Sequence, residues 1–198
     1  MKLLIASNNP HKYEEIISIL DLVLGGKIEV LTPDMVINYH LYVEENSNTL
    51  EGNAKLKAET YCHVSNLPCI ADDTGLEIEA LNGDPGIHSA RFSGIHGNDI
   101  LNRKKVLELM KNVPFSNRRA RFRTVICYFD KNIEKYIEGI CTGYISLYEK
   151  GKNGFGYDSI FIPDGFNITF AEMESSIKNS ISHRGKAIEN LIEFLKSI

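Results

Sequence analysis

The chain has 198 residues, of which 43% are hydrophobic and 24% are charged, a composition typical of a soluble globular protein. This length suits one domain, 1–198, with a substantial core and room for two lobes. The net charge of −4 disfavours a nucleic-acid partner, so a polyanionic ligand would need local cations or a metal. No run approaches the roughly 18 apolar residues that a membrane span needs.

Two further features predict a cytoplasmic protein. The apolar start, residues 1–6, is too short for a signal-peptide core. The four cysteines show no C-x-x-C spacing and lie in apolar contexts, which predicts buried thiols in a reducing compartment. The six histidines show no i, i+4 pair that would indicate a metal site.

The first half of the chain begins with a predicted strand at 2–6. A helix follows from Pro10, with an apolar stripe at Ile16, Ile17, Leu20 and Leu24, and Gly25-Gly26 ends it. A second strand is expected at 27–31, a loop at 33–48 and a helix at 49–63. The stretch 68–81 reads as strand, acidic turn and strand.

The second half predicts a helix at 99–111 and two long strands at 119–129 and 133–148. A glycine-rich loop, 151–156, precedes a short strand at 159–162. An amphipathic helix at 184–195 ends the chain. Helices mixed with a large, partly antiparallel sheet predict an α/β or α+β fold.

The acidic turn presents Asp72 and Asp73 directly after an apolar run. Adjacent carboxylates repel each other, and burying them is costly unless a cation compensates. The pair is therefore a candidate Mg²⁺ site, since this ion takes one or two protein carboxylates plus water and phosphate. The alternative is a solvated turn in which the acids cap local N–H groups.

The turn Ser7-Asn8-Asn9 precedes a helix, and a helix N-terminus attracts anions. Lys12, one turn later, could add its ammonium to a bound phosphate. The alternative is simple helix capping.

Two later segments add possible ligand contacts. Phe155 lies between two glycines and could stack on a flat base, although a glycine-rich turn with a core Phe is the alternative. Lys178, His183 and Arg184 could supply local positive charge, unless they are only solvated cations at a helix start.

These segments resemble motifs of the inosine triphosphate pyrophosphatase family and occur in the same order along the chain. The family comprises the Ham1-type pyrophosphatases, which act on non-standard purine nucleoside triphosphates. The resemblance spans nearly the whole chain. The segments that carry it are Ser7-Asn8-Asn9 with Lys12, 71–76, 85–92, 154–158, 169–172 and 182–187.

The resemblance implies a large mixed sheet flanked by helices, with two lobes and an active-site cleft between them. It implies a role for each matching residue. Ser7, Asn8, Asn9 and Lys12 would hold the triphosphate, and Glu45 and Asp73, with Asp72 beside it, would bind Mg²⁺. Asp73 would also accept a proton. The other substrate-binding residues would be Lys57, Thr74, Phe155, Gly156, Tyr157, Asp158, Lys178, His183 and Arg184.

The implied reaction is Mg²⁺-dependent hydrolysis of ITP, dITP and XTP to the monophosphate and pyrophosphate, by a cytoplasmic homodimer. A donor-only Arg184 facing the 6-keto group would favour these substrates over ATP. Two residues depart from the family pattern: Thr74 stands in place of serine, and Ser159 in place of proline. Glu44 lies next to Glu45 and could replace it.

Other readings stay open. The closest alternative is a pyrophosphatase for other modified nucleotides, and an aspartyl phosphatase is disfavoured because the D-x-D-G-T order is absent. A nucleotide sensor without activity would leave the paired acids without purpose. Finally, Arg118–Arg123 could form a nucleic-acid-binding strand, although alternation of Arg119, Arg121 and Arg123 also fits one solvated strand face.

Overall fold

The computed structural model describes residues 1–24 and 28–198. The strands form one seven-stranded mixed sheet in the order β2-β1-β3-β5-β6-β7, with β4 paired to β3. β1 pairs in parallel with β2 and β3, whereas β4 is antiparallel to β3 and β7 is antiparallel to β6. The predicted mixed, partly antiparallel α/β fold is therefore confirmed. The strands are β1 Lys2–Ile5, β2 Glu29–Leu31, β3 Cys69–Ile78, β4 Pro85–Gly86, β5 Arg119–Phe129, β6 Glu134–Ile145 and β7 Phe161–Pro163.

The helices follow the predicted order with two additions. The helices are α1 Pro10–Leu24, α2 Pro33–Val36, α3 Leu50–Ser65, α4 Asp99–Leu109, α5 Ser175–Ile181 and α6 His183–Ser197. The expected loop at 33–48 contains the single turn α2, and α5 was not predicted. The predicted helix end at Gly25-Gly26, the strand start at Lys27 and the burial of Leu24 lie outside the described residues.

The chain divides into two compact units, each made of separate segments. Unit 1 comprises Met1–Asp73, Thr124–Gly139 and Arg184–Ile198, and unit 2 comprises Thr74–Arg123 and Ile140–His183. The strands β3, β5 and β6 each contribute residues to both units. Neither unit is therefore a continuous stretch of sequence.

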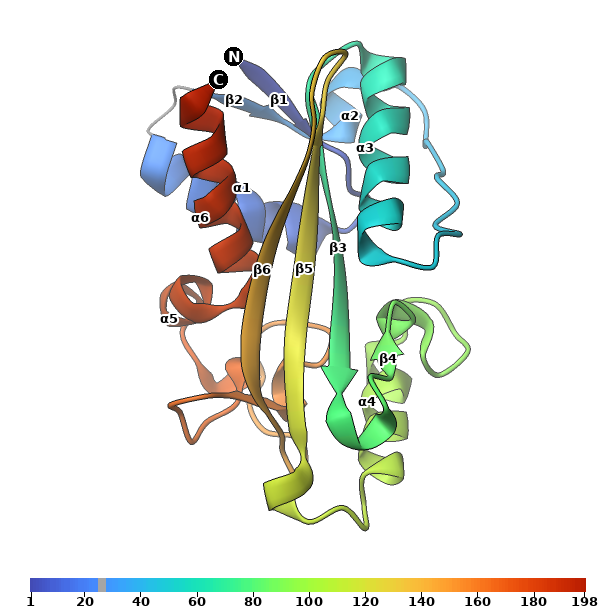
Figure 1. Cartoon of the computed structure of the whole chain (residues 1–198), viewed down its shortest axis with the longest axis vertical. Helices are drawn as coiled ribbons and strands as arrows, with labels where there is room; N and C mark the ends of the chain where they lie inside the picture. The colour runs from blue at the N-terminus through green and yellow to red at the C-terminus, as the bar shows by residue number, and fades with distance from the viewer. Residues whose placement is uncertain (25–27) are drawn as a thin grey trace. The chain divides into compact units, whose positions relative to one another are not determined.

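In unit 1 the sheet is covered on both faces. Consecutive strand residues point to opposite faces. Leu3 and Ile5 accordingly pack with residues of α1 and α6, while Leu4 and Ala6 pack with residues of α3. Figure 1 shows α1 and α6 on one side of these strands and α3 on the other. The predicted apolar face of α6 is buried at Ala187, Ile188, Leu191, Ile192 and Leu195.

Unit 2 has its own core of aromatic and aliphatic side chains. Phe122 of β5 contacts the ring of Phe161 with 4.7 Å between centroids, and Phe170 packs against Phe161 at 5.1 Å. Val106 and Met110 of the α4 region are buried with them. Ile100, in the first turn of α4, is 56% exposed.

Candidate active site

The structure corrects the predicted acidic turn at Asp72-Asp73. Both residues lie inside β3, a continuous strand of ten residues that has neighbours on both sides in the sheet. Because side chains alternate along a strand, the two carboxylates point to opposite faces rather than side by side. Their direct ion-pair partners differ, since Asp72 contacts Lys12 and Arg184 whereas Asp73 contacts Lys57, and this compensation explains why consecutive buried acids are tolerated without a turn.

Asp72 faces α1 and α6. Its Oδ2 lies 3.2 Å from Lys12 Nζ and accepts hydrogen bonds from Nε and Nη2 of Arg184 at 3.3 and 3.2 Å. Burial alone would raise the pKa of this carboxyl, but Lys12 and Arg184 hold the pKa well below its usual range. Asp72 is thus a fixed anion between two buried cations.

Arg184 has a second carboxylate partner that sequence reasoning missed. Its Nη1 donates to Oε2 of Glu15 at 2.5 Å, and the Arg184 side chain is only 3% exposed. Burial opposes the charge of Arg184, but Asp72 and Glu15 outweigh it and raise the pKa of the guanidinium. Three of the five N–H donors of an arginine are thereby directed at carboxylates of unit 1.

Asp73 faces α3. Its Oδ2 accepts a hydrogen bond from Nδ2 of Asn53 at 3.2 Å, and its Oδ1 lies 3.7 Å from Lys57 Nζ. Lys57 also donates to Oε2 of Glu45 at 2.9 Å. Burial raises the pKa of the Asp73 carboxyl despite Lys57 and Lys12, so this carboxyl holds a proton more readily than Asp72 does.

Glu45 and Asp73 therefore converge on one ammonium group. Among the described residues there is no group of three or more Asp, Glu, His or Cys able to hold a metal. Two carboxylates that share one cation nevertheless fit a hard divalent ion whose remaining ligands are water and phosphate oxygens. Asp72 and Asp73, predicted to share one metal site, do not contact the same cation in this way, because Asp72 faces Lys12 and Arg184.

The turn before α1 is built by capping. The Asn9 side chain accepts the N–H of His11, and Oγ of Ser7 accepts the N–H of Asn9. The Asn8 amide contacts the hydroxyl of Tyr61 and the carbonyl of Leu41. The capping bonds expected from the alternative interpretation are present, and the turn belongs to the same unit as Lys12 and Asp73. A cavity of about 550 Å³ adjoins this turn.

Unit 2 holds the remaining predicted residues. Lys178 donates to Oδ2 of Asp158 at 2.8 Å, and both side chains are buried. The same carboxylate oxygen accepts the N–H of Phe155, and Lys178 Nζ lies 5.2 Å from the centre of the Phe155 ring. Lys178 is therefore not a solvated cation. It is the counter-ion of Asp158, the acid that binds the loop backbone at Phe155.

Gly154 has a steric role in this loop. Its φ is +73°, and a Cβ there would meet Oδ2 of Asp158 at 2.0 Å. Tyr157 donates its hydroxyl to the carbonyl of Ser89 at 2.7 Å, and Oγ of Ser89 accepts the N–H of Leu76 in β3. Thr74, two residues earlier in β3, is half-buried. His183 stacks on Phe122 with 4.4 Å between ring centroids.

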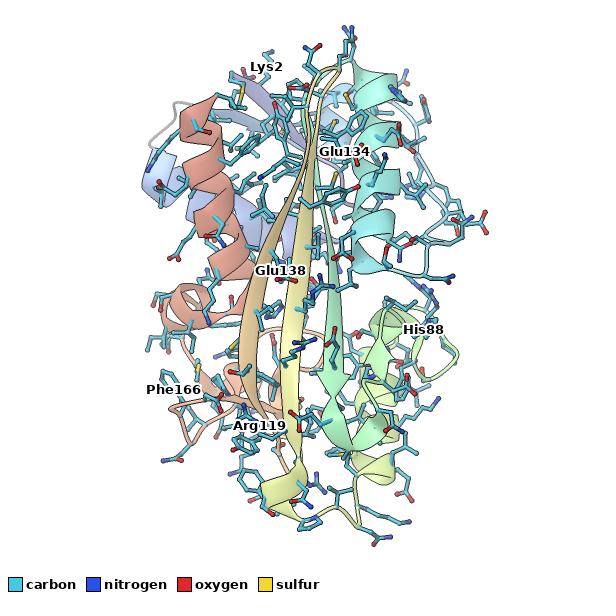
Figure 2. The ribbon with its side chains drawn as sticks, viewed as in Figure 1. Lys2, His88, Arg119, Glu134, Glu138 and Phe166 are labelled. Carbon is cyan, nitrogen blue, oxygen red and sulfur yellow. The ribbon has the colours of Figure 1, made fainter. Side chains whose placement is uncertain are left out.

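The arginine-rich strand does not form a free basic surface. Arg119 donates two hydrogen bonds to Asp164, and Arg121 pairs with Glu77 at 2.6 Å. Figure 2 shows Arg119 near one end of β5. Arg118 is buried and donates to backbone carbonyls of Val113 and Ser146. These contacts favour a structural role over nucleic-acid binding.

Comparison with known proteins decides the family. The sequence profile of the Ham1 family matches residues 3–194. The chain belongs to the Ham1 family. Its relatives include proteins named dITP/XTP pyrophosphatase from Porphyromonas gingivalis and Flavobacterium johnsoniae. The first is 46% identical over 98% of this chain and 97% of its own length, and the second is 44% identical over 98% of both.

Solved structures of Ham1 proteins share the fold. The Staphylococcus aureus Ham1 protein superimposes with a TM-score of 0.87 at 37% identity, covering 100% of this chain and 99% of that one. A Ham1 protein from Coxiella burnetii gives 0.88 at 33% identity, with both chains covered completely. The resemblance stated from the sequence is thus confirmed.

Two residues in contact with the charged groups were not predicted from the sequence. Glu15 lies on α1 and Asn53 on α3, and each contacts a residue far along the chain. Oδ1 of Asn53 also accepts the N–H of Ser47, two residues after Glu45. Only the i, i+3 spacing of Lys12 and Glu15 and the i, i+4 spacing of Asn53 and Lys57 could have indicated shared helix faces.

Within the described parts of the chain, no helix has the length and apolar character to traverse a bilayer. All four cysteines are buried free thiols, as predicted.

Proposed function

We propose that the protein hydrolyses the non-standard purine nucleoside triphosphates ITP, dITP and XTP to the monophosphate and pyrophosphate. One observation carries this proposal: Glu45 and Asp73 share the ammonium of Lys57 in the same unit that holds Lys12 and the Ser7–Asn9 turn. Membership of the Ham1 family supports it, as do the relatives named dITP/XTP pyrophosphatase.

The substrate triphosphate would lie against the cations of unit 1. Ser7, Asn8 and Asn9 offer backbone and side-chain donors before the α1 N-terminus, and Lys12 adds an ammonium. Burial, with Lys57 and Arg184 nearby, lowers the pKa of the Lys12 ammonium, and the adjacent Asp72 carboxylate favours its charged form. Lys57 would turn from the carboxylates toward a phosphate once another cation binds them.

Glu45 and Asp73 would hold Mg²⁺, which, when bound, stabilises the charge of the leaving pyrophosphate and acidifies water. Asp73 would accept a proton from the attacking water at a carboxylate oxygen. Asn53 keeps that carboxylate oriented, and Lys57 supplies compensating positive charge. Asp72 would act as the counter-ion of Lys12 and Arg184 rather than as a metal ligand.

Base recognition would use unit 2. Phe155 would stack on the purine, with Gly156, Tyr157 and Asp158 shaping the pocket around it. Thr74, Lys178 and His183 of this unit, together with Arg184 of unit 1, would complete the contacts to the nucleotide. Replacement of Arg184 by alanine should reduce the preference for ITP over ATP, and an unchanged preference would refute base reading by this residue.

The remaining proposals concern the whole protein. Residues 1–198 act as one domain, because the chain enters each unit repeatedly and three strands contribute to both. A cytoplasmic location fits a nucleotide substrate and four reduced thiols. A homodimer and the absence of nucleic-acid or membrane partners are proposed from the family resemblance and the acidic net charge.

A phosphate assay tests the reaction directly. The protein is incubated with ITP and Mg²⁺, and orthophosphate is measured before and after addition of an inorganic pyrophosphatase. Signal that appears only after the addition is the expected result, since the product is pyrophosphate. Direct release of orthophosphate would contradict the proposal. A panel of dITP, XTP, ATP, GTP and other modified nucleotides then separates the main reading from the closest alternative.

A further inference from the structure

Two side chains of α4 fix both backbone polar groups of Gly156. Oδ2 of Asp99 accepts the N–H of Gly156 at 2.8 Å, and Nη1 of Arg103 donates to its carbonyl at 2.8 Å. Asp99 and Arg103 stand four residues apart, so they project from the same helix face. Both bonds involve a charged side chain, which makes each stronger than a neutral hydrogen bond.

Arg103 is itself held from a second direction. Its Nε donates to Oε2 of Glu149 at 2.8 Å, and the hydroxyl of Ser159 donates to the same oxygen at 3.0 Å. The Arg103 side chain is only 16% exposed, so its guanidinium is well shielded from water. Ser159 is the residue that replaces the usual proline. Its hydroxyl makes a contact that proline has no group to make.

The same loop is fixed on its other side by the buried ion pair. Asp158 accepts the N–H of Phe155 at 3.0 Å and the ammonium of Lys178 at 2.8 Å. Gly156 has a φ of +60°, a conformation that other residues rarely adopt. Phe155 is thus placed between two independently anchored points of the backbone.

We propose that Asp99, Arg103, Glu149 and Ser159 form a positioning brace that sets how tightly the purine ring binds. The proposal rests on the proposed function, in which Phe155 stacks on the base. The brace fixes the backbone of the residue that follows Phe155, and it acts on the purine only through that backbone. Because stacking is the same before and during phosphate cleavage, the brace raises affinity for the substrate without changing the chemical step.

Steady-state kinetics with ITP and saturating Mg²⁺ test the brace. In Arg103→Gln, loss of a charge-assisted hydrogen bond should raise KM about tenfold and leave kcat within about twofold of the unaltered protein. Asp99→Asn keeps an acceptor but loses the charge, so KM should rise about threefold. Ser159→Ala, which loses a contact to an exposed acid, should raise KM about twofold.

Lys104→Gln is the matched control, because it makes the same kind of change at an exposed neighbour on α4. Its KM and kcat should both be unchanged. A KM for ITP that stays the same in Arg103→Gln and Asp99→Asn would overturn the brace. A fall of kcat as large as the expected rise of KM would also overturn it, since a merely structural defect lowers the fraction of active protein and therefore kcat.

The outcome separates the brace from the function on which it rests. If the unaltered protein does not turn over ITP, the proposed function fails and the brace fails with it. If the unaltered protein is active and the variants have the same KM for ITP as the unaltered protein, only the brace fails. If Arg103→Gln does not fold, as judged by circular dichroism, the Asp99→Asn and Ser159→Ala series decides alone.

Discussion

The two units each bury acids and cations, but they combine them differently. Unit 1 assembles the cations Lys12, Lys57 and Arg184 with four carboxylates, and Lys57, Arg184 and Asp72 each contact two groups of opposite charge. The carboxylates are Glu15, Glu45, Asp72 and Asp73. Unit 2 buries the pair Lys178–Asp158, in which the acid also accepts a backbone N–H of the adjacent loop.

This difference separates two uses of buried charge. The Lys178–Asp158 ion pair fixes geometry, since its acid also accepts the N–H of Phe155 and so holds a loop. In unit 1, burial raises the pKa of Asp73, whereas Lys12 and Arg184 overcome burial and lower the pKa of Asp72, so the two neighbouring acids differ in how readily they hold a proton. The proposed function uses this second arrangement, in which Lys57 would exchange partners when substrate binds.

The largest expected effect concerns Asp73. Replacing it by asparagine removes the proposed base and metal ligand while keeping the shape of the side chain. Turnover of ITP should fall about 10⁴-fold, equivalent to about 5 kcal/mol. Pyrophosphate release at saturating Mg²⁺ measures this. Retention of most of the turnover would show that Asp73 is not the base.

Asp72 should matter for stability more than for the chemical step. In Asp72→Asn, Lys12 and Arg184 would remain buried next to each other without their shared anion. Breaking a buried ion pair in this way should lower the free energy of unfolding by about 4 kcal/mol. Urea unfolding measures the loss. A change below about 1 kcal/mol would mean that Asp72 is not an essential counter-ion.

The pair in unit 2 should behave as a separable unit. Lys178→Met leaves the Asp158 carboxylate buried without its cation and should cost about 3 kcal/mol. Adding Asp158→Asn removes that charge while keeping an acceptor for the Phe155 N–H, so the double variant should recover most of the stability. A double-mutant cycle by urea unfolding tests this. No recovery would show that the pair is part of a larger network, as in unit 1.

Dependence on pH should distinguish the two neighbouring acids in metal-free protein. The folded pKa of Asp72 is lowered, so its stabilisation is complete above the unfolded value near pH 3.9 and is lost as pH falls toward the folded pKa. The folded pKa of Asp73 is raised, so its stabilisation is present below about pH 3.9 and is lost as pH rises through the folded pKa.

Each acid contributes at most about 1.4 kcal/mol per pH unit. Asp73→Asn should therefore be more stable than the unaltered protein at pH 7, with the gain vanishing near pH 3. Asp72→Asn should show the opposite trend. Urea unfolding at several pH values with a chelator present makes the comparison, and parallel curves for the two variants would contradict the assignment.

The smallest effect is expected at an exposed pair in unit 1. Lys2 and Glu29 lie 3.7 Å apart with both side chains 58% exposed, and Figure 2 shows Lys2 beside the start of β1. Lys2→Ala should change the free energy of unfolding by less than about 1 kcal/mol. A larger loss would mean that exposure is a poor guide to the strength of ion pairs in this unit.

Local patterns predicted the helices and long strands well, because each has a repeating apolar face. The stripes of α1 and α6 and the alternation of Ala120 and Phe122 in β5 are examples. The acidic turn was wrong for a physical reason. Consecutive aspartates favour a turn unless buried cations compensate them, and the cation Arg184 lies 112 residues away from Asp72.

The site was predicted residue by residue through family resemblance, whereas its connections were not. Nothing local to Asn53 indicates that it links Asp73 to the backbone of Ser47. The same holds for Arg103, which looks like an ordinary cation on a surface helix until its partners are seen. Partner choice across the fold depends on tertiary packing, which a single sequence does not display.

The position of two acids in one strand has a consequence for how this chain tolerates length changes. A slip of β3 by one residue against its neighbouring strands would exchange the sides of the sheet reached by the two carboxylates. The acid that contacts Lys57 would then face the side of Arg184. A single residue inserted inside the strand should therefore harm the site far more than one inserted in the preceding loop, which can absorb it without a change of register.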